Sequence, residues 1–328
     1  MIRKLPDDTG TDEADPGAYH IPVLLAETLQ YLQPAPGQTV LDATVGGGGH
    51  SMRIAQALIP GGTLIGLDRD PEAIAEASRV LAPYRQSLTI ILARTTFSKI
   101  GTVLDANPEL AGRLLDGALM DLGVSSHQLD TPRGFSFRRD EPLDMRMDPG
   151  DATTPTAAQF LATASEREIA QVLWEYGEER FSRRIARAIV ERRQRGERIE
   201  TTAQLAALVA QCVPRAAWPD RIHVATRTFQ GIRIRVNREL EELQAGLQAV
   251  IRRLAPGGRI AVLSYHSLED RIVKQTFASA AGRASTMQEV DLPELELLTR
   301  KPVMPPVAEV AQNPRARSAR LRAARRIA

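Results

Sequence analysis

Four consecutive glycines, Gly46 to Gly49, follow closely on the short apolar run Thr39 to Ala43. An apolar strand that runs into a glycine-rich turn and then a helical pattern is typical of the first unit of an α/β fold. Without side chains, the turn lets the backbone approach a ligand, which in such folds binds outside the carboxyl ends of the strands. The stretch therefore predicts a cofactor site, and the alternative is a tight turn with no ligand.

Strand and helix patterns alternate along much of the chain. Apolar strands are predicted at 39–43, 63–68, 88–92, 117–122 and 259–265. Asp70 and Pro71 form a typical helix start, with Asp70 at the N-cap and Pro71 in the first turn. This βαβ series predicts a doubly wound parallel sheet.

From about 155 to 219 only helical patterns occur, with capping boxes predicted at Ser165 with Glu168 and at Thr201 with Gln204. We interpret this region as a helical insert. The expected organisation is an N-terminal tail at 1–18, a discontinuous α/β domain at 19–138 and 236–328, and the insert at 139–235.

Composition excludes several classes of protein. A single cysteine, Cys212, excludes an intramolecular disulfide and any cysteine-cluster metal site. A net charge of +2 gives no strong overall field, so any basic surface must be local. No long apolar segment or signal-peptide pattern is present, which favours a soluble, cytoplasmic protein.

Two cofactor classes compete for the glycine turn. A dinucleotide site favours G-x-G-x-x-G, but the third glycine of the frame set by Gly46 and Gly48 falls on Ser51. S-adenosylmethionine also needs a close glycine turn, with an acid at the end of the second strand for the ribose hydroxyls. Asp68 occupies that position.

Three polar segments are expected at the same edge of the sheet. They read DLGVSSHQLD from residue 121, RGFSFRRDEPLDMRMD from residue 133 and SYHSLEDR from residue 264. Two of them follow predicted strands directly. Their convergence predicts a site at this edge rather than a bare turn.

With these motifs the chain resembles the RsmH (MraW) family of bacterial ribosomal RNA methyltransferases. The resemblance extends from HIPVLLAETL at residue 20, through LDRDPEAI and TFQGIRIRVNREL, to NPRARSARLR at residue 313. It implies a class I S-adenosylmethionine-dependent methyltransferase fold, with the insert as a substrate-recognition domain. It also implies methylation of the exocyclic N4 of cytosine 1402 in the decoding region of 16S rRNA, within the small ribosomal subunit.

The resemblance also assigns cofactor contacts. The glycine turn, the ribose-binding acid, the residue beside the adenine and the contacts after the fourth strand fall on Gly48, Gly49, His50, Asp68, Phe97, Asp121 and Gln128. One departure is His127, which stands where many members have proline. A less rigid loop is the expected consequence.

The reaction needs no metal, because a sulfonium donor is already activated and the enzyme mainly aligns the reactants. Acceptors on the cytosine amine would stabilise the developing positive charge. We expect Asp121, Ser125 and Ser126 beside that amine, with His266, Glu269 or Asp270 taking the released proton. The alternatives are structural: Ser125 caps a helix, Asp121 only holds the cofactor, and Glu269 and Asp270 start a helix and pair with Arg271.

RNA binding requires local basic surface. The segment 313–328 holds six arginines and no acid, which is also typical of a solvated helix face or a loose tail. We expect its removal to weaken RNA binding but not cofactor binding. The candidate RNA contacts are Arg138, Arg139, Arg315, Arg317, Arg320 and Arg322, and the candidate aromatic groups for stacking on a flipped base are Phe135, Phe137 and Tyr265.

Two functions of other classes stay open at this point. One is a dinucleotide-dependent oxidoreductase, which the glycine spacing disfavours. The other is a non-catalytic ribosome-assembly factor with a vestigial cofactor pocket. The sequence also leaves the oligomeric state open between monomer and homodimer.

Overall fold

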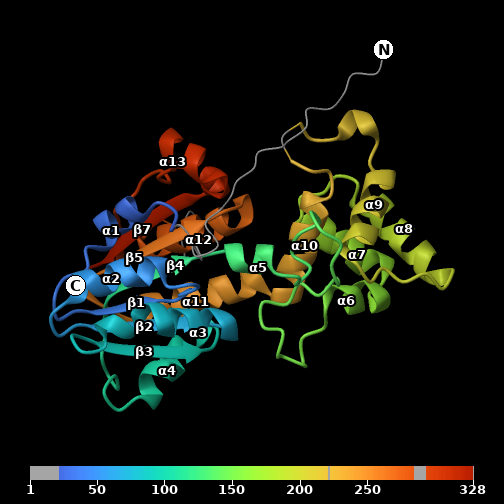
Figure 1. Ribbon diagram of the computed structural model, residues 1–328. Coiled ribbons are helices and arrows are strands. Elements are labelled where there is room, and N and C mark those ends of the chain that lie inside the picture. Colours follow the sequence, from blue (N-terminus) through green and yellow to red (C-terminus); the bar gives the residue numbers. More distant parts are fainter. Residues whose placement is uncertain (1–21, 221, 284–292, 328) are drawn as a thin grey trace.

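The computed structural model describes residues 22–220, 222–283 and 293–327 (Figure 1). Its described strands form one sheet in the order β3-β2-β1-β4-β5-β7-β6. They are β1 (Thr39–Asp42), β2 (Thr63–Asp68), β3 (Thr89–Arg94), β4 (Leu115–Asp121), β5 (Leu254–Ser264), β6 (Leu295–Leu297) and β7 (Arg320–Arg326). Strands β1 to β5 pair in parallel, whereas β7 is antiparallel to β5 and β6. The predicted doubly wound α/β fold is confirmed, and the predicted tail at 1–18 lies outside the described residues.

Helices cover both faces of this sheet. Their bounds are α1 (Leu25–Leu32), α2 (Gly49–Leu58), α3 (Pro71–Leu81), α4 (Ile100–Ala106), α11 (Glu239–Arg253), α12 (Ser267–Ala280) and α13 (Val307–Gln312). Short 3-10 helices are η1 (Ala82–Tyr84), η2 (Phe97–Lys99), η3 (Arg215–Ala217) and η4 (Pro314–Ser318).

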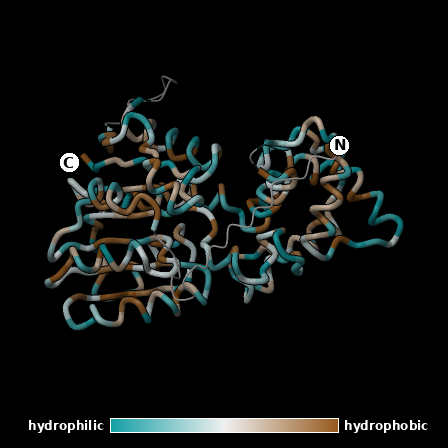
Figure 2. The backbone as a smooth tube through the Cα atoms, turned by 45° about the horizontal axis from the view of Figure 1, so that its top comes forward, coloured by the Kyte–Doolittle hydropathy of each residue, from teal (hydrophilic) through white to brown (hydrophobic). Residues whose placement is uncertain are grey.

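Alternate strand residues supply the two cores. In β1, Val40 packs in the cluster shared with α1, α2 and α3, whereas Leu41 packs in the cluster shared with α4, α11 and α12. This alternation follows from the pleat of a strand, which points successive side chains to opposite faces. Because both faces of the sheet are covered, the central strands β1, β2 and β4 are mostly hydrophobic, and Figure 2 shows brown stretches in the sheet.

A helical part stands beside the sheet (Figure 1). It contains α6 (Ala157–Thr163), α7 (Glu166–Glu175), α8 (Ser182–Gln194), α9 (Thr202–Cys212) and α10 (Thr226–Asn237), and α5 (Ser126–Asp130) lies between it and the sheet. Its buried residues, from Phe135 to Val236, form a hydrophobic cluster of their own. The exact boundaries 139–235 stay a prediction.

Of the three predicted helix N-termini, those at Asp70 and Thr201 are confirmed, and the capping box at Ser165 is only half formed. Asp70 caps α3 by accepting from the Glu72 N–H at 3.0 Å, and Thr201 and Gln204 form the full capping box of α9. Ser165 makes only the forward bond to the Glu168 N–H. The Glu168 side chain is instead paired with Arg235 at 3.2 Å, which draws it away from the cap.

In the described residues, the arginine-rich C-terminal segment is a short 3-10 helix, η4, with exposed Arg315 and Arg317, followed by a strand rather than a loose tail. Residues 320–326 form β7 between β5 and β6, and residues 321–324 are buried. Removing the last sixteen residues would therefore remove a strand from inside the sheet, so truncation cannot test RNA binding alone. No helix in the described ranges combines the length and the apolar character needed to cross a bilayer.

Candidate active site

A pocket opens at the carboxyl ends of β1, β2 and β4. The glycine turn, the start of α11 and the segment after β5 complete its walls. Of the predicted site residues, it is lined by Gly49, His50, Asp68, Phe97, Asp121, Ser125, Gln128, Tyr265 and Glu269. Its lining does not include Gly48, Ser126, His266, Asp270 or the predicted RNA-binding arginines.

The glycine turn needs glycine at two positions. Gly46 and Gly48 have φ values of 50° and 83°, in the left-handed region that other residues rarely adopt. A Cβ on Gly48 would lie 3.4 Å from Val80 and 3.5 Å from Ala77 in α3. Gly48 therefore shapes the turn and its packing, while Gly46 and Gly49 face the pocket.

Asp68 holds the turn from the end of β2. Its carboxylate accepts the N–H of Gly46 at 3.0 Å and the N–H of Asp70 at 2.9 Å. Burial raises the pKa of Asp68 to about 6, although these backbone hydrogen bonds oppose the shift. Each carboxylate oxygen has a further lone pair for a ligand hydroxyl in the pocket.

Asp121 is the centre of a polar network at the end of β4. The Tyr265 hydroxyl donates to Asp121 Oδ1 at 2.8 Å, and the Asp121 N–H donates to Thr44 Oγ1 at 2.6 Å. His50 Nδ1 lies 3.5 Å from Asp121 Oδ2, while His50 Nε2 donates to the Val23 carbonyl at 3.1 Å. Burial first, and then the Asp121 charge, raise the pKa of Tyr265 well above its ordinary value.

The sequence predicts Tyr265 only as a stacking group, and no sequence signal indicates its hydrogen bond to Asp121. The two residues are 144 positions apart, and only the parallel pairing of β4 with β5 brings them together.

Ser125 and Gln128 connect α5 to α3. Ser125 is the N-cap of α5 in a full capping box with Gln128, so the structural alternative for Ser125 is observed. Gln128 Nε2 also donates to Asp70 Oδ2 at 3.0 Å. His127, at the departure from the family pattern, contacts Glu72 at 2.5 Å, which ties α5 to α3 a second time.

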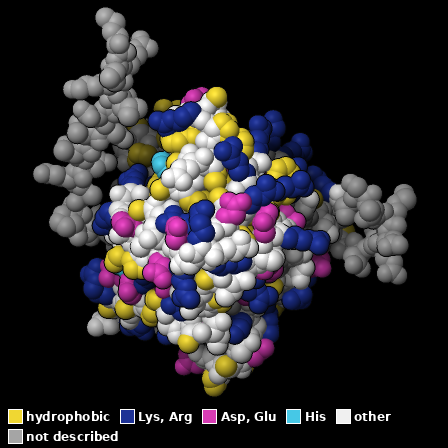
Figure 3. Space-filling model, turned by 90° about the vertical axis from the view of Figure 1, so that its right-hand side faces the viewer, with side chains coloured by type: hydrophobic (Ala, Val, Ile, Leu, Met, Phe, Trp, Pro, Cys, Tyr) yellow, Lys and Arg dark blue, Asp and Glu magenta, His cyan; other side chains and the backbone are white. Residues whose placement is uncertain are grey.

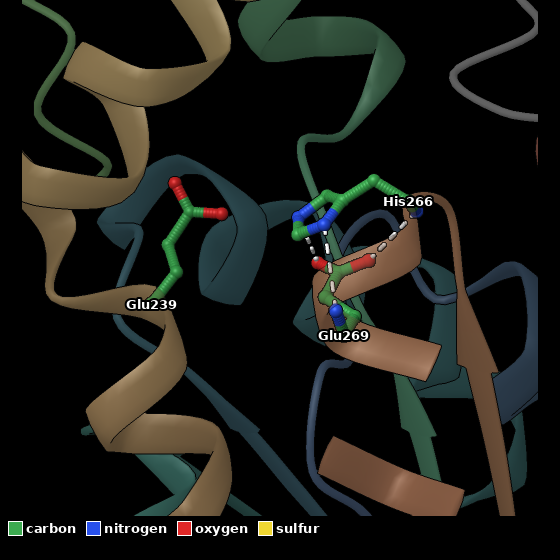
Figure 4. A group of neighbouring side chains, drawn as sticks. All are labelled: Glu239, His266 and Glu269. Carbon is green, nitrogen blue, oxygen red and sulfur yellow. Dashed lines mark hydrogen bonds and ion pairs between the residues drawn. The ribbon is translucent and has the colours of Figure 1, made fainter. Parts of the chain in front are cut away.

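Glu269 and His266 form a buried pair beside the pocket (Figure 4). The Tyr265 N–H donates to Glu269 Oε2 at 2.8 Å, and Glu269 Oε1 lies 3.2 Å from His266 Nε2. Burial alone would raise the pKa of Glu269, but His266 and the nearby Arg233 lower it below its ordinary value. Glu269, which is 2% exposed, is therefore an ionised carboxylate at the pocket wall.

Glu239, His266 and Glu269 also place one potential metal ligand each within 4.8 Å of one another (Figure 4). However, the Arg233 guanidinium donates to both carboxylate oxygens of Glu239, at 2.9 Å each. A cation there would lie next to a buried guanidinium that already neutralises Glu239. We therefore interpret these residues as an acid–base cluster rather than a metal centre.

Asp270 points to the C-terminal strand. Arg322 donates to it at 2.7 Å and Arg320 at 3.2 Å. Burial opposes these interactions, but the two arginines lower the pKa of Asp270. Arg271, the partner suggested by sequence, lies 3.8 Å from Glu178 instead.

The predicted RNA-binding arginines fall into two groups. Arg138 and Arg317 are exposed, and their side chains have no hydrogen-bond or ion-pair partner among the described residues. The others interact with acidic side chains or backbone oxygens: Arg139 with Asp130 and Glu141, Arg315 with Asp130, and Arg320 and Arg322 with Asp270.

Two of the proposed stacking groups belong to the core of the helical part. Phe135 is buried in its cluster, and the Phe137 ring lies 5.0 Å from that of Phe229 and 4.5 Å from that of His223.

Comparison with known proteins identifies the family. Residues 17–327 match the MraW methylase family. Ribosomal RNA small subunit methyltransferase H of Geotalea uraniireducens is 48% identical over 94% of this chain and 99% of that protein, and the protein of the same name from Symbiobacterium thermophilum is 49% identical over 93% and 96%. The solved structure of an rRNA methylase from Streptococcus thermophilus aligns over 94% of this chain and 99% of that protein's chain. Its TM-score is 0.43 and its sequence identity is 10%, so we infer no property of this chain from it. The family match and the described architecture confirm the expected class I methyltransferase fold, and this chain belongs to the MraW methylase family.

Proposed function

We propose that the protein transfers the methyl group of S-adenosylmethionine to the exocyclic N4 of a cytosine in 16S rRNA of the small ribosomal subunit. The observation that carries the proposal is one pocket, in a chain of this family, that joins the glycine turn, Asp68 and Asp121. The relatives named as ribosomal RNA small subunit methyltransferases support the substrate class.

The residues present fit the cofactor. Asp68 offers carboxylate oxygens to ribose hydroxyls, and Phe97 and Leu243 supply an apolar wall for a base. The glycine turn lets backbone groups approach without side-chain interference. When bound, the cofactor supplies an electrophilic methyl group on a sulfonium centre.

We assign the two remaining roles, stabilisation of the developing charge and removal of the proton, to Asp121 and Glu269. Tyr265 holds the Asp121 carboxylate, which accepts a hydrogen bond from the target amine and stabilises its developing positive charge. Glu269, at the same wall, takes the proton that the nitrogen releases once its bond to the methyl carbon has formed. His266 Nε2 lies 3.2 Å from Glu269 Oε1 and helps to keep that carboxylate ionised, so it positions the proton acceptor. Ser126 and Asp270 lie outside the lining, so we assign them no step.

We propose that the helical part, at 139–235, recognises the RNA around the target base. Arg138 and Arg317 contribute phosphate contacts, since their side chains have no partner in the described chain. A ribosomal RNA substrate would place the enzyme in the cytoplasm.

The test is incubation of the protein with isotopically labelled S-adenosylmethionine and small subunits from a strain that lacks the modification. After digestion of the RNA, mass spectrometry should find the label in N4-methylcytidine. Label in a different nucleoside would contradict the proposed position. Cofactor binding without any label would favour the non-catalytic assembly factor.

A further inference from the structure

An open groove lies between α7 and α8, outside the pocket described above. Figure 1 shows these two helices on the side of the helical part that faces away from the sheet. The groove is lined by Glu166, Arg167, Ala170, Gln171, Trp174, Arg180, Phe181, Ser182, Arg183, Arg184 and Arg187. Its lining therefore contains five arginines and one acid.

Most of these arginines have no acidic partner. Arg187 lies 3.8 Å from Glu166, but Arg167, Arg180, Arg183 and Arg184 form no ion pair with any described carboxylate. All five are exposed. Figure 3 looks onto this side of the molecule and shows Lys and Arg side chains spread over it. The groove is a local positive surface on a chain whose net charge is only +2.

Three of the groove arginines, Arg183, Arg184 and Arg187, lie at positions in α8 that are slightly unfavourable for the stability of this helix. Arg183 and Arg184 lie in the first turn of α8, which contains no acid, and the N-cap residue makes no side-chain cap. A helix N-terminus favours negative charge, so cations there are slightly destabilising. Arg183 and Arg187 are also like charges four residues apart. An anion seated in the groove would relieve both penalties.

Trp174 adds a flat apolar group to the groove. Its side chain is 60% exposed, although α7 already buries Ile169, Val172 and Leu173 in the core. Folding therefore does not require an aromatic ring at this position. Exposed aromatic rings beside arginines are typical of surfaces that bind single-stranded nucleic acid, where bases stack on the rings and phosphates contact the guanidinium groups.

We propose that the α7–α8 groove is a second RNA-binding site, in which the arginines hold the phosphates of an unpaired segment and Trp174 stacks on one of its bases. The inference deepens the proposed function, because it assigns a contact to the same substrate away from the methylated base. A contact on the outer side of the helical part would help the enzyme select one cytosine within a large folded RNA.

Two sets of variants test the groove. Trp174→Ala and the double variant Arg183→Glu/Arg187→Glu should each raise KM for unmodified small subunits at least about tenfold, with kcat and cofactor affinity unchanged. Trp174→Phe should restore most of the loss, because phenylalanine still offers a ring. Arg113→Glu/Arg252→Glu is the matched charge control, since both arginines are exposed and form no ion pair with a described residue. Unchanged KM in both groove variants would overturn the inference.

Filter binding separates this inference from the proposed function, because it needs no turnover. Wild-type protein and the variants are titrated with small subunits and with protein-free 16S rRNA. Weaker binding of both probes by the groove variants supports the RNA site, even if no methyl transfer is found. A loss confined to intact subunits would mean that the groove contacts a ribosomal protein, and the RNA assignment would be wrong.

Discussion

The ring of Phe97 lies directly against the bare backbone of Gly246. A Cβ on Gly246 would lie 2.3 Å from Phe97 Cδ2 and 2.8 Å from Cε2, closer than atoms can approach. Gly246 belongs to α11, and Phe97 belongs to η2 and lines the pocket. The absence of a side chain on one helix thus sets the position of the apolar wall that we assign to the cofactor base.

Gly246→Ala should displace the Phe97 ring and weaken binding of S-adenosylhomocysteine about tenfold, roughly 1.4 kcal/mol. Overpacking of this kind also costs about 1–3 kcal/mol of stability. Isothermal titration calorimetry measures the affinity. Gly101→Ala is the control, because its Cβ would meet only the Arg253 side chain, at 3.6 Å. Equal affinity of Gly246→Ala and wild type would contradict the role of Phe97.

Cofactor affinity should decrease as the pH falls through about 6. Burial raises the pKa of Asp68 to about 6, so the group is ionised at pH 7 and protonated at pH 5. The ionised form is the better acceptor for ribose hydroxyls, so protonation should weaken binding, by up to about tenfold per pH unit below the pKa. Calorimetric titration with S-adenosylhomocysteine between pH 5 and pH 7.5 checks this. Asp68→Asn should bind weakly with a flatter profile; a profile as steep as that of wild type would assign the titration to another group.

Tyr265→Phe tests the polar network around Asp121. The substitution removes the 2.8 Å hydrogen bond to Asp121 Oδ1 and leaves that carboxylate free to turn. A hydrogen bond to a charged group contributes about 1.5–3 kcal/mol, so kcat at saturating substrates should fall by roughly 10- to 100-fold. Steady-state methylation of small subunits at saturating cofactor measures kcat. Unchanged turnover would mean that Tyr265 does not position Asp121 for the reaction.

The parts of the fold that the sequence predicted depend on local chemistry. The strand at 63–68 has the predicted bounds, and the cap at Asp70 and the capping box at Thr201 follow from residues three positions apart or fewer. The glycine turn and Asp68 are local signals too, since the turn follows β1 and Asp68 is the last residue of β2. Their meeting in one pocket follows from the parallel order of the sheet.

The features that the sequence does not predict depend on residues that interact across a long stretch of the chain. The sequence RLRAARR does not predict strand β7, because an arginine at position 322 is expected to be exposed unless a carboxylate pairs with it. Asp270, 52 positions away, is that carboxylate, and it allows Arg322 to be only 8% exposed. For the same reason the sequence places Asp270 in the site, although its carboxylate pairs with Arg320 and Arg322 of β7.

Glu269→Gln and Asp270→Asn separate catalysis from packing at adjacent positions. Glu269→Gln keeps the shape of the side chain but cannot take a proton, so kcat should fall about 100-fold or more with cofactor affinity retained. Asp270→Asn should keep kcat within about twofold but lower the free energy of unfolding by about 1–3 kcal/mol, because Arg320 and Arg322 lose their charged partner. Turnover at saturating substrates and urea unfolding measure the two effects. The opposite pattern would place the proton acceptor on Asp270, and it would require the Arg320 and Arg322 pairs to open when RNA binds.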